Sequence, residues 1–377
     1  MTDQQYASGY IYPVDEAIAY FTNRLERTTL SDYAVKAAQK HPAIGDRIRL
    51  ILEPTVELER RINAAVPSLD RDCEFFFSLD NSVNGEKKPL TNAAWLLMGA
   101  RACFGEEPAD IDGMLASRLA LSKEDRDRLF LSYLFDLEEK TVRETGVPAG
   151  VGLLELIAGS GINSLTRIKL TELYLHFDEH LFRLAEILRP AADAIAGAAE
   201  LYTGALLKLR RLLGADGGVR EYLASMHGFD IGEVSSVFPR FSLMAPQTVM
   251  IREGLFDGMD VYVGVCVEEL AALAAPGTES ERMVSVFKLL SDETRLRMLR
   301  AVVMKPMYGL ELAETFSVTA PTVSYHMTKL VMSGLVDSYF EDGKGYFRAN
   351  RQALTAFSRS IDSFFGLAEE RGEESGE

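Results

Sequence analysis

The chain has 377 residues, 47% of them hydrophobic and 25% charged, and its formal net charge is −16. This composition is typical of a globular protein rather than a disordered one. No run of 18 or more residues is apolar and free of charge, which excludes a predicted transmembrane helix. The length predicts two or three domains.

The charge is distributed unevenly along the chain. Residues 280–366 contain 11 Lys or Arg and 9 Asp or Glu, a net charge of +2, whereas 1–279 carries −14 and 367–377 carries −4. Salt screens charges over about 10 Å at 0.1 M, so an acidic body need not cancel a local basic surface. The three cysteines (Cys73, Cys103 and Cys266) are far apart and lack metal-ligand spacing, and the start of the chain lacks the pattern of a secretion signal. We therefore expect a cytoplasmic protein.

The first part of the chain reads as mostly helical. Residues 1–66 have helical spacing, CEFFFSL (73–79) is an apolar run that we interpret as core, and 121–144 begins with the helix-capping Ser122. The Gly-rich stretch 146–161 predicts turns around a short helix, and 164–213 predicts a long helical region broken at Pro190.

One flank of that helical region carries candidate metal ligands. Glu172, His176 and His180 follow one another at intervals of four residues, and two His at this spacing can bind a divalent metal. The alternative is that they are ordinary polar residues on the solvent side of a helix. No further ligand is identifiable, and we predict neither a metal nor a cofactor for this protein.

From about residue 231 the pattern changes to that of strands. EVSSVFPRFSL, QTVMIRE and DVYVGVCVEE are short, β-branched and aromatic, and they predict a small sheet that closes the first domain. The run VYVGVCV is apolar at nearly every position, which is typical of a strand buried on both faces. The small and polar residues of 271–282 predict a linker.

The segment from 283 onward predicts a helix-turn-helix followed by a hairpin. A helix beginning at Met283 is followed by DETRLRMLRAVVM, which we expect to be capped by Ser291 and to turn Leu296, Leu299 and Val303 inward. GLELAETF, the turn SVTA and a helix capped by Thr319 come next, and then LVDSYF and GYFRAN flank the turn EDGK. A last helix follows, ALTAFSRSIDSFFG.

In the helix after Thr319, the residues Val323, Met327 and Leu330 have core spacing, which leaves the other side for recognition. The outward face is expected to hold Thr322, Tyr325, His326 and Lys329. This order of elements predicts a winged helix-turn-helix, whose second helix enters the DNA major groove. The predicted fold is therefore mainly α, with an acidic helical α+β domain over 1–275 for sensing or dimerisation, a winged helix-turn-helix over 280–366, and an acidic tail over 367–377.

The C-terminal module resembles the ArsR/SmtB-type transcriptional regulators. The resemblance is carried by LLSDETRLRMLR, LELAETFSV, TAPTVSYHMTKLVMSGLV and the hairpin up to Arg348, about 85 of the 377 residues. It implies that the partner is double-stranded DNA and that its phosphates are contacted by Lys329, Lys344 and Arg348. It also implies a groove-facing set of Thr319, Thr322, Ser324, Tyr325 and His326.

The sequence departs from that family at several positions. Ala320 stands where the family often has Gln, and Tyr308 and Leu310 occupy the places of the family's metal-binding cysteines. No His follows His326, so the family's metal sites are absent from this module. Arg295 is expected to form an internal salt bridge with Asp292. As an alternative to contacting the DNA groove, Tyr325 and His326 merely cover the surface of the module.

The resemblance also implies a homodimer formed through the first and last helices of the module, which would place two recognition helices about 34 Å apart on a pseudo-palindromic operator. We expect a regulator and not an enzyme, with the N-terminal domain modulating DNA affinity through an unknown small molecule or protein. Two alternatives stay open: an enzyme within 1–275, although no known catalytic motif is present, and an interaction scaffold whose winged helix binds protein.

Overall fold

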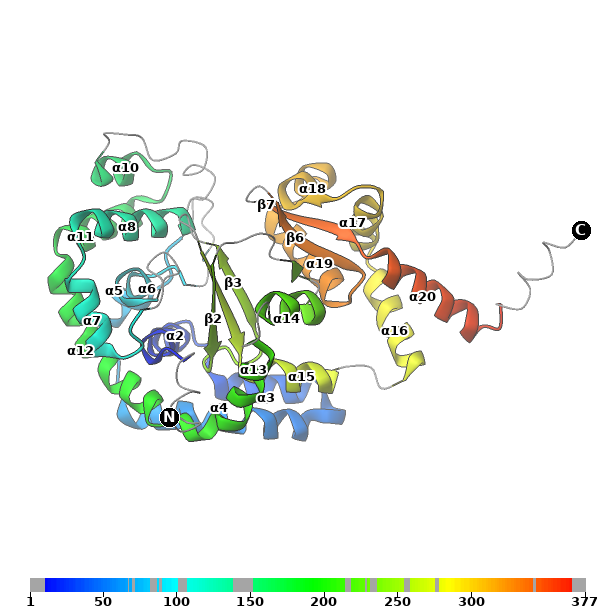
Figure 1. The fold of residues 1–377 in the computed structure, drawn as a ribbon, viewed down its shortest axis with the longest axis horizontal. Coiled ribbons are helices and arrows are strands. Elements are labelled where there is room, and N and C mark those ends of the chain that lie inside the picture. Colours follow the sequence, from blue (N-terminus) through cyan, green and yellow to red (C-terminus); the bar gives the residue numbers. More distant parts are fainter. Residues whose placement is uncertain are drawn as a thin grey trace, which may run out of the picture. The chain divides into compact units, whose positions relative to one another are not determined.

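The chain folds into two compact units (Figure 1). The structure is a computed structural model. It describes residues 11–66, 68–69, 72–81, 87, 90–100, 107–137, 152–213, 218–227, 229–230, 236–253, 258–274, 278–341 and 344–367. The N-terminal unit comprises Met1–Arg210 and Val234–Leu273, and the C-terminal unit comprises Arg211–Glu233 and Ala274–Glu377.

The N-terminal unit is largely helical, as the sequence predicted. Its helix α12 packs against α2, α4 and α7, and α2 also packs against α5 and α6. Phe76 and Phe77 of the CEFFFSL run are buried in this core, which agrees with their interpretation as packing residues. The helices are α2 (Pro13–Leu25), α3 (Leu30–Lys40), α4 (Gly45–Ala65), α5 (Cys73–Phe77), α6 (Ala93–Met98), α7 (Ile111–Leu119), α8 (Lys123–Leu137), α10 (Leu153–Gly159), α11 (Ser164–Leu175), α12 (Phe177–Ala196), α13 (Thr203–Leu213) and α15 (Val267–Ala274), with 3-10 turns at Pro42–Ile44 and Ala199–Tyr202.

The long helical region 164–213 is interrupted at a different place from the one predicted. Pro190 lies inside α12, whereas α11 ends at Leu175 and α12 begins at Phe177. The residue between them, His176, has φ −114° and ψ 36°, which is outside helical geometry. A helix can tolerate a proline by giving up one backbone hydrogen bond, so the residue type alone did not locate the break.

A three-stranded sheet completes the N-terminal unit, and its existence was predicted. The strands are β2 (Val237–Ser242), β3 (Val249–Glu253) and β4 (Met259–Gly264), in the order β2-β4-β3. β2 runs parallel to β4 and β3 antiparallel to it. Every residue of β4 is buried, as expected for a strand covered on both faces. The strand ends at Gly264. Val265 and Cys266, which had been included in the predicted strand, form a turn, and α15 begins at Val267.

One face of this sheet carries buried charges. Arg240 lies opposite Tyr262 and Arg252 opposite Asp260, so strand pairing places all four residues on the same face. Arg240 Nε donates to Asp260 Oδ1 at 3.0 Å, and Arg252 Nη2 donates to Asp136 Oδ2 at 2.5 Å. Buried charges are costly unless they are paired, and these pairs satisfy that requirement.

Helix α2 adds two buried carboxyl groups, Asp15 and Glu16. Glu16 Oε2 accepts hydrogen bonds from the backbone N–H groups of Leu243 and Met244, at 2.9 and 2.7 Å. Burial raises the pKa of Glu16 to about 8 in spite of those two bonds. Burial likewise raises the pKa of Asp15 to about 6, although the charge of Arg240 opposes the shift. Folding therefore favours the neutral form of both acids.

The C-terminal unit contains the predicted winged helix-turn-helix. Its sheet has the order β1-β6-β7-β5, in which β6 and β7 form the antiparallel wing hairpin. The turn residues 342–343 lie outside the described residues. The elements are α14 (Gly218–His227), β1 (Phe229–Asp230), α16 (Glu279–Leu290), α17 (Glu293–Met304), β5 (Met307–Tyr308), α18 (Gly309–Phe316), α19 (Ala320–Met332), β6 (Val336–Glu341), β7 (Lys344–Ala349) and α20 (Arg351–Phe364).

The division of the chain into units differs from the predicted domain boundaries. Residues 211–233 had been assigned to an N-terminal domain over 1–275, but they group with the C-terminal unit. The reason is a long-range pairing: β1 lies parallel to β6, with Phe229 opposite Ser338 and Asp230 opposite Tyr339. A two-residue strand has no sequence signature of its own, so this excursion was not predicted.

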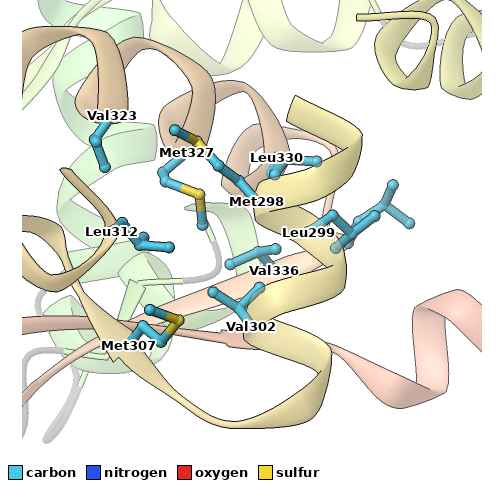
Figure 2. Packing of buried hydrophobic residues seen from close by; sticks show 10 residues of the cluster. Met298, Leu299, Val302, Met307, Leu312, Val323, Met327, Leu330 and Val336 are labelled. Carbon is cyan, nitrogen blue, oxygen red and sulfur yellow. The ribbon is translucent and has the colours of Figure 1, made fainter. Parts of the chain in front are cut away.

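The core of the C-terminal unit joins the helix-turn-helix to the wing (Figure 2). Figure 2 shows Met298 and Val302 of α17, Leu312 of α18 and Val323 and Met327 of α19 gathered around a common centre. The predicted inward positions Val323, Met327 and Leu330 are all buried. This packing fixes how α19 is presented to solvent.

Two predictions for α17 were wrong. Asp292, not Ser291, caps this helix, with its side chain accepting a hydrogen bond from the backbone N–H of Arg295. Leu296, which was expected to face inward, is 47% exposed, while Met298 and Val302 are buried. The buried residues of α17 are Arg295, Met298, Leu299 and Val302, so its buried stripe lies about one residue, or about 100° of helix rotation, from the predicted one.

Candidate nucleic-acid interface

The turn between α18 and α19 sets the direction of the second helix. Ser317 adopts a left-handed conformation with φ 53° and ψ 43°, and the backbone N–H of Val318 closes the turn on Ala313 O at 3.0 Å. Thr319 then caps α19, accepting a hydrogen bond from the backbone N–H of Thr322. The predicted cap is thus confirmed, and Pro321 lies in the first turn, where its missing N–H has no partner to lose.

The outward face of α19 carries polar side chains. Thr319 and Ser324 are exposed, Tyr325 is 55% exposed, and Thr322 and Lys329 are half-buried. Lys329 Nζ donates to the Tyr325 hydroxyl at 2.6 Å and lies 4.1 Å from the centre of its ring. This ammonium lowers the pKa of Tyr325. Tyr325 and Lys329 therefore form a joint hydrogen-bonding and cationic group at the helix surface.

His326 does not belong to that face, and its predicted outward position is wrong. Its side chain is buried, and Nδ1 lies 3.7 Å from Asp292 Oδ1 at the beginning of α17. Asp292 has a lowered pKa, mainly because it accepts the N–H of Arg295 and also because of the nearby His326. The side chain of His326 thus points from α19 toward Asp292, the capping residue of α17.

Arg295 takes the internal position that was expected. Its Nη2 lies 3.9 Å from Asp292 Oδ2, and its Nη1 donates to the carbonyl of Leu289 at 2.6 Å. The side chain is buried, so Arg295 ties α16 to α17 and is removed from the solvent-facing surface of the module.

One exposed polar residue of α19 was missed. Thr328 is exposed and lies one helical turn after Ser324, on the same side of α19. The helical period alone, extended four residues from Ser324, would have identified it.

The wing holds the remaining predicted contacts. Arg348 of β7 is exposed, with Nε 3.6 Å from Asp337 Oδ2 and its guanidinium carbon 5.1 Å from the centre of the Tyr339 ring. Lys344 is the first residue of β7 and is in register with Glu341. Cations on a wing are suited to phosphate contacts beside the groove that a recognition helix enters.

The candidate metal ligands of the N-terminal unit are only partly brought together. His180 Nε2 lies 3.6 Å from Glu172 Oε1, but His176 pairs with Glu179 across 3.9 Å and lies in the break between two helices. His180 is buried against Phe75 and Phe76, and burial lowers its pKa. Among the described residues, no three His, Cys, Asp or Glu side chains form a group that could hold a metal. Of all the helices that the structure describes, none is both long and apolar enough to cross a membrane.

Comparison with known proteins finds relatives for the C-terminal region. A helix-turn-helix domain matches residues 290–339. Arsenical resistance operon repressors from Staphylococcus xylosus and Staphylococcus aureus are 28% and 30% identical over 82 residues, which are 22% of this chain and 79% of each repressor. The HTH-type transcriptional regulator KmtR of Mycobacterium tuberculosis is 43% identical over 77 residues, 20% of this chain and 51% of that protein. No solved structure matches the chain.

The match to the helix-turn-helix domain, residues 290–339, falls on α17, α18, α19 and the beginning of the wing. It covers the elements that carry the exposed polar face of α19, and it agrees with the resemblance found in the sequence. Through its C-terminal region, the chain belongs to the ArsR family of DNA-binding helix-turn-helix transcriptional regulators.

Proposed function

We propose that this regulator binds a pseudo-palindromic operator as a homodimer, and that its N-terminal unit changes its affinity for DNA in response to a ligand or protein partner. The observation that supports operator recognition most directly is the polar outer face of α19, which starts at a well-formed cap and carries Tyr325 and Lys329. A recognition helix reads base edges mainly through residues near its N-terminus.

The solvent exposure of the side chains on α19 and on the wing determines which residues we assign to DNA contacts. Thr322, Ser324, Tyr325 and Thr328 would contact base edges, because hydroxyl groups can both donate and accept hydrogen bonds in the major groove. Thr319 at the cap would contact the backbone or an adjacent base. Lys329, Lys344 and Arg348 would contact phosphates and supply most of the salt-dependent affinity. His326 is not part of this surface.

Exposed apolar residues on α16 and α20 support the homodimer. The two helices pack on each other, and the rings of Phe287 and Phe357 meet at 5.6 Å. Even so, α20 has no buried residue, and Phe287, Phe364 and Phe365 are 46%, 54% and 61% exposed. Exposed aromatic residues of this kind are common at interfaces, and a two-fold axis would let the same helices cover each other.

We further propose that the N-terminal unit is a regulatory part and has no enzymatic activity of its own. Its sequence contains no known catalytic motif, and its net charge over 1–279 is −14, which opposes non-specific attraction to DNA. Such a unit can alter DNA affinity only if its effector binds the two states of the protein with different affinity.

Selection of bound duplexes from a random pool tests operator recognition. We expect an enriched two-fold motif whose half-sites are one helical turn apart. On that motif, Tyr325→Ala should relax sequence preference, whereas Arg348→Ala should weaken binding to all sequences and reduce the salt slope by about one. Arg49→Ala, which removes an exposed arginine from the N-terminal unit, is the matched control and should change neither. A pool without enrichment, together with no salt-dependent duplex binding, would refute the proposal.

Light scattering of the full-length chain tests the dimer. We expect twice the mass of one chain, and Phe364→Glu should shift the protein toward the monomer because it places a charge in the apolar surface. Leu165→Glu is the control, since Leu165 is an apolar residue of the N-terminal unit that is 79% exposed. A monomeric wild type, or equal effects of the two substitutions, would contradict the assigned interface.

A further inference from the structure

Residues 211–233 connect the N-terminal unit to the wing by an unusual route. The chain passes from the N-terminal unit into the C-terminal unit after Arg210 and returns at Val234, and in between it contributes α14 and β1. This segment lies outside the matched helix-turn-helix, residues 290–339. An earlier part of the chain therefore contributes a helix and a strand to the C-terminal unit.

Strand β1 makes β6 an internal strand of the wing sheet. β7 pairs with one edge of β6, and β1 pairs with the other, with Phe229 opposite Ser338 and Asp230 opposite Tyr339. Without β1, β6 would be an edge strand with unpaired backbone N–H and C=O groups. Pairing on both edges restrains the backbone at Ser338 and Tyr339.

Tyr339, which is one of the two restrained residues, and Asp337, which precedes the other, contact the wing arginine Arg348. The ring of Tyr339 stacks on Tyr346, with centroids 5.5 Å apart and an angle of 19° between the planes. On the same strand face, Tyr339 and Asp337 contact Arg348, the tyrosine through its ring and the aspartate through an ion pair. Asp337 and Tyr339 are the immediate neighbours of Ser338, so β1 pairs with the backbone at the centre of this arginine-holding group.

We propose that β1 acts as a positioning strand for DNA binding: by pairing with β6 it fixes Tyr339 and Asp337, which hold Arg348 ready for a phosphate contact. Tyr339 is a positioning residue in this scheme and does not itself contact DNA. The inference rests on the proposed function, because it assigns a phosphate to Arg348. It adds a route for regulation, since any state of the N-terminal unit that draws 211–233 away from β6 would release the arginine.

Two kinds of variant of the full-length chain test this inference. Phe229→Pro combined with Asp230→Pro removes the backbone donors of β1, and one of the two must face β6 because neighbouring residues of a strand direct their N–H groups to opposite sides. Tyr339→Leu removes the aromatic ring with β1 intact. Tyr339→Phe is the control, since it keeps the stacked ring and its face for the guanidinium.

We expect the double-proline variant and Tyr339→Leu each to weaken duplex binding about tenfold, as for the loss of one charged hydrogen bond. Both should lower the salt slope by about one, as Arg348→Ala does, and leave the selected sequence motif unchanged. Adding Arg348→Ala to either variant should cause no further loss. Tyr339→Phe should bind as the wild type does.

Amide hydrogen exchange distinguishes a local loss of the β1–β6 pairing from a general loss of stability. In the double-proline variant, the amides of β6 should exchange faster while those of α17 and α19 keep their protection. If β6 loses protection and DNA binding keeps its full affinity and salt slope, β1 pairs with the wing but does not position Arg348, and the inference is overturned. If the wild type does not bind duplex DNA at all, the proposed function fails and takes this inference with it.

Discussion

Replacing Glu16 with Gln should remove most of the stability that the buried carboxyl groups of the N-terminal unit lose between pH 5 and pH 8. The carboxyl group of Glu16 is buried, and its pKa is raised from 4.5 to about 8. Between these two values the folded state holds a proton that the unfolded state releases. The free energy of unfolding must therefore fall as the pH rises from about 4.5 through 8, and it levels off above 8.

The magnitude follows from the two pKa values. From pH 5 to pH 8, Glu16 should remove about 3.5 kcal/mol from the free energy of unfolding, at 1.36 kcal/mol per unit of pKa difference. Asp15, with its pKa raised to about 6, should remove about 1.4 kcal/mol over the same range by the same reasoning. Glu16→Gln keeps an oxygen acceptor for the backbone N–H groups of Leu243 and Met244 but cannot ionise, so only the smaller dependence should remain.

Urea unfolding at several pH values, followed by tryptophan fluorescence, measures this effect. Trp95 is the single tryptophan of the chain and is buried in α6, so its signal reports on the N-terminal unit alone. We expect the variant to match the wild type closely at pH 5 and to be more stable at pH 8. Two parallel pH profiles would show that Glu16 is ionised in the folded protein at neutral pH, and the reasoning from its burial would be wrong.

Further substitutions probe the C-terminal unit, each read by thermal unfolding of the full-length chain. Leu312→Ala should remove about 2–5 kcal/mol because it leaves a cavity in the core, whereas Leu310→Ala, at a residue 53% exposed, should change stability by less than about 0.5 kcal/mol. Ser317→Gly should stabilise by about 0.5–1 kcal/mol, because Ser317 has φ 53° and glycine adopts this conformation without strain. Thr319→Ala should cost about 1 kcal/mol, since the backbone N–H of Thr322 loses its side-chain acceptor. Equal losses for Leu312→Ala and Leu310→Ala, a destabilised Ser317→Gly, or an unchanged Thr319→Ala would each contradict the local structure.

Features set by local sequence could be predicted, and features set by distant contacts could not. The cap at Thr319 and the core positions Val323 and Met327 follow from residue type and helical period, and the structure has them where they were expected. His326 is polar and adjacent to these positions, but it is buried, with Nδ1 3.7 Å from Asp292, which lies 34 positions earlier. Residue type favours the surface for such a side chain, so only the packing of α19 against α17 could reveal its place.

The same distinction applies to larger elements. The three strands of the first sheet are signalled by runs of β-branched and aromatic residues. β1 is two residues long, and its partner β6 lies more than 100 positions away, so no window of sequence contains both. The predicted boundary at 275 rested on composition, which cannot register a segment that leaves one unit and returns to it.

That excursion has a consequence for dissecting the protein. A single cut between Ala274 and Thr278 would yield an N-terminal fragment that still carries β1 and a C-terminal fragment that carries β6. The pairing of β1 with β6 would then hold the two fragments together, although no peptide bond links them. Co-purification after such a cut would reflect the pairing of β1 with β6. Separating the two fragments would require removal of 211–233 as well.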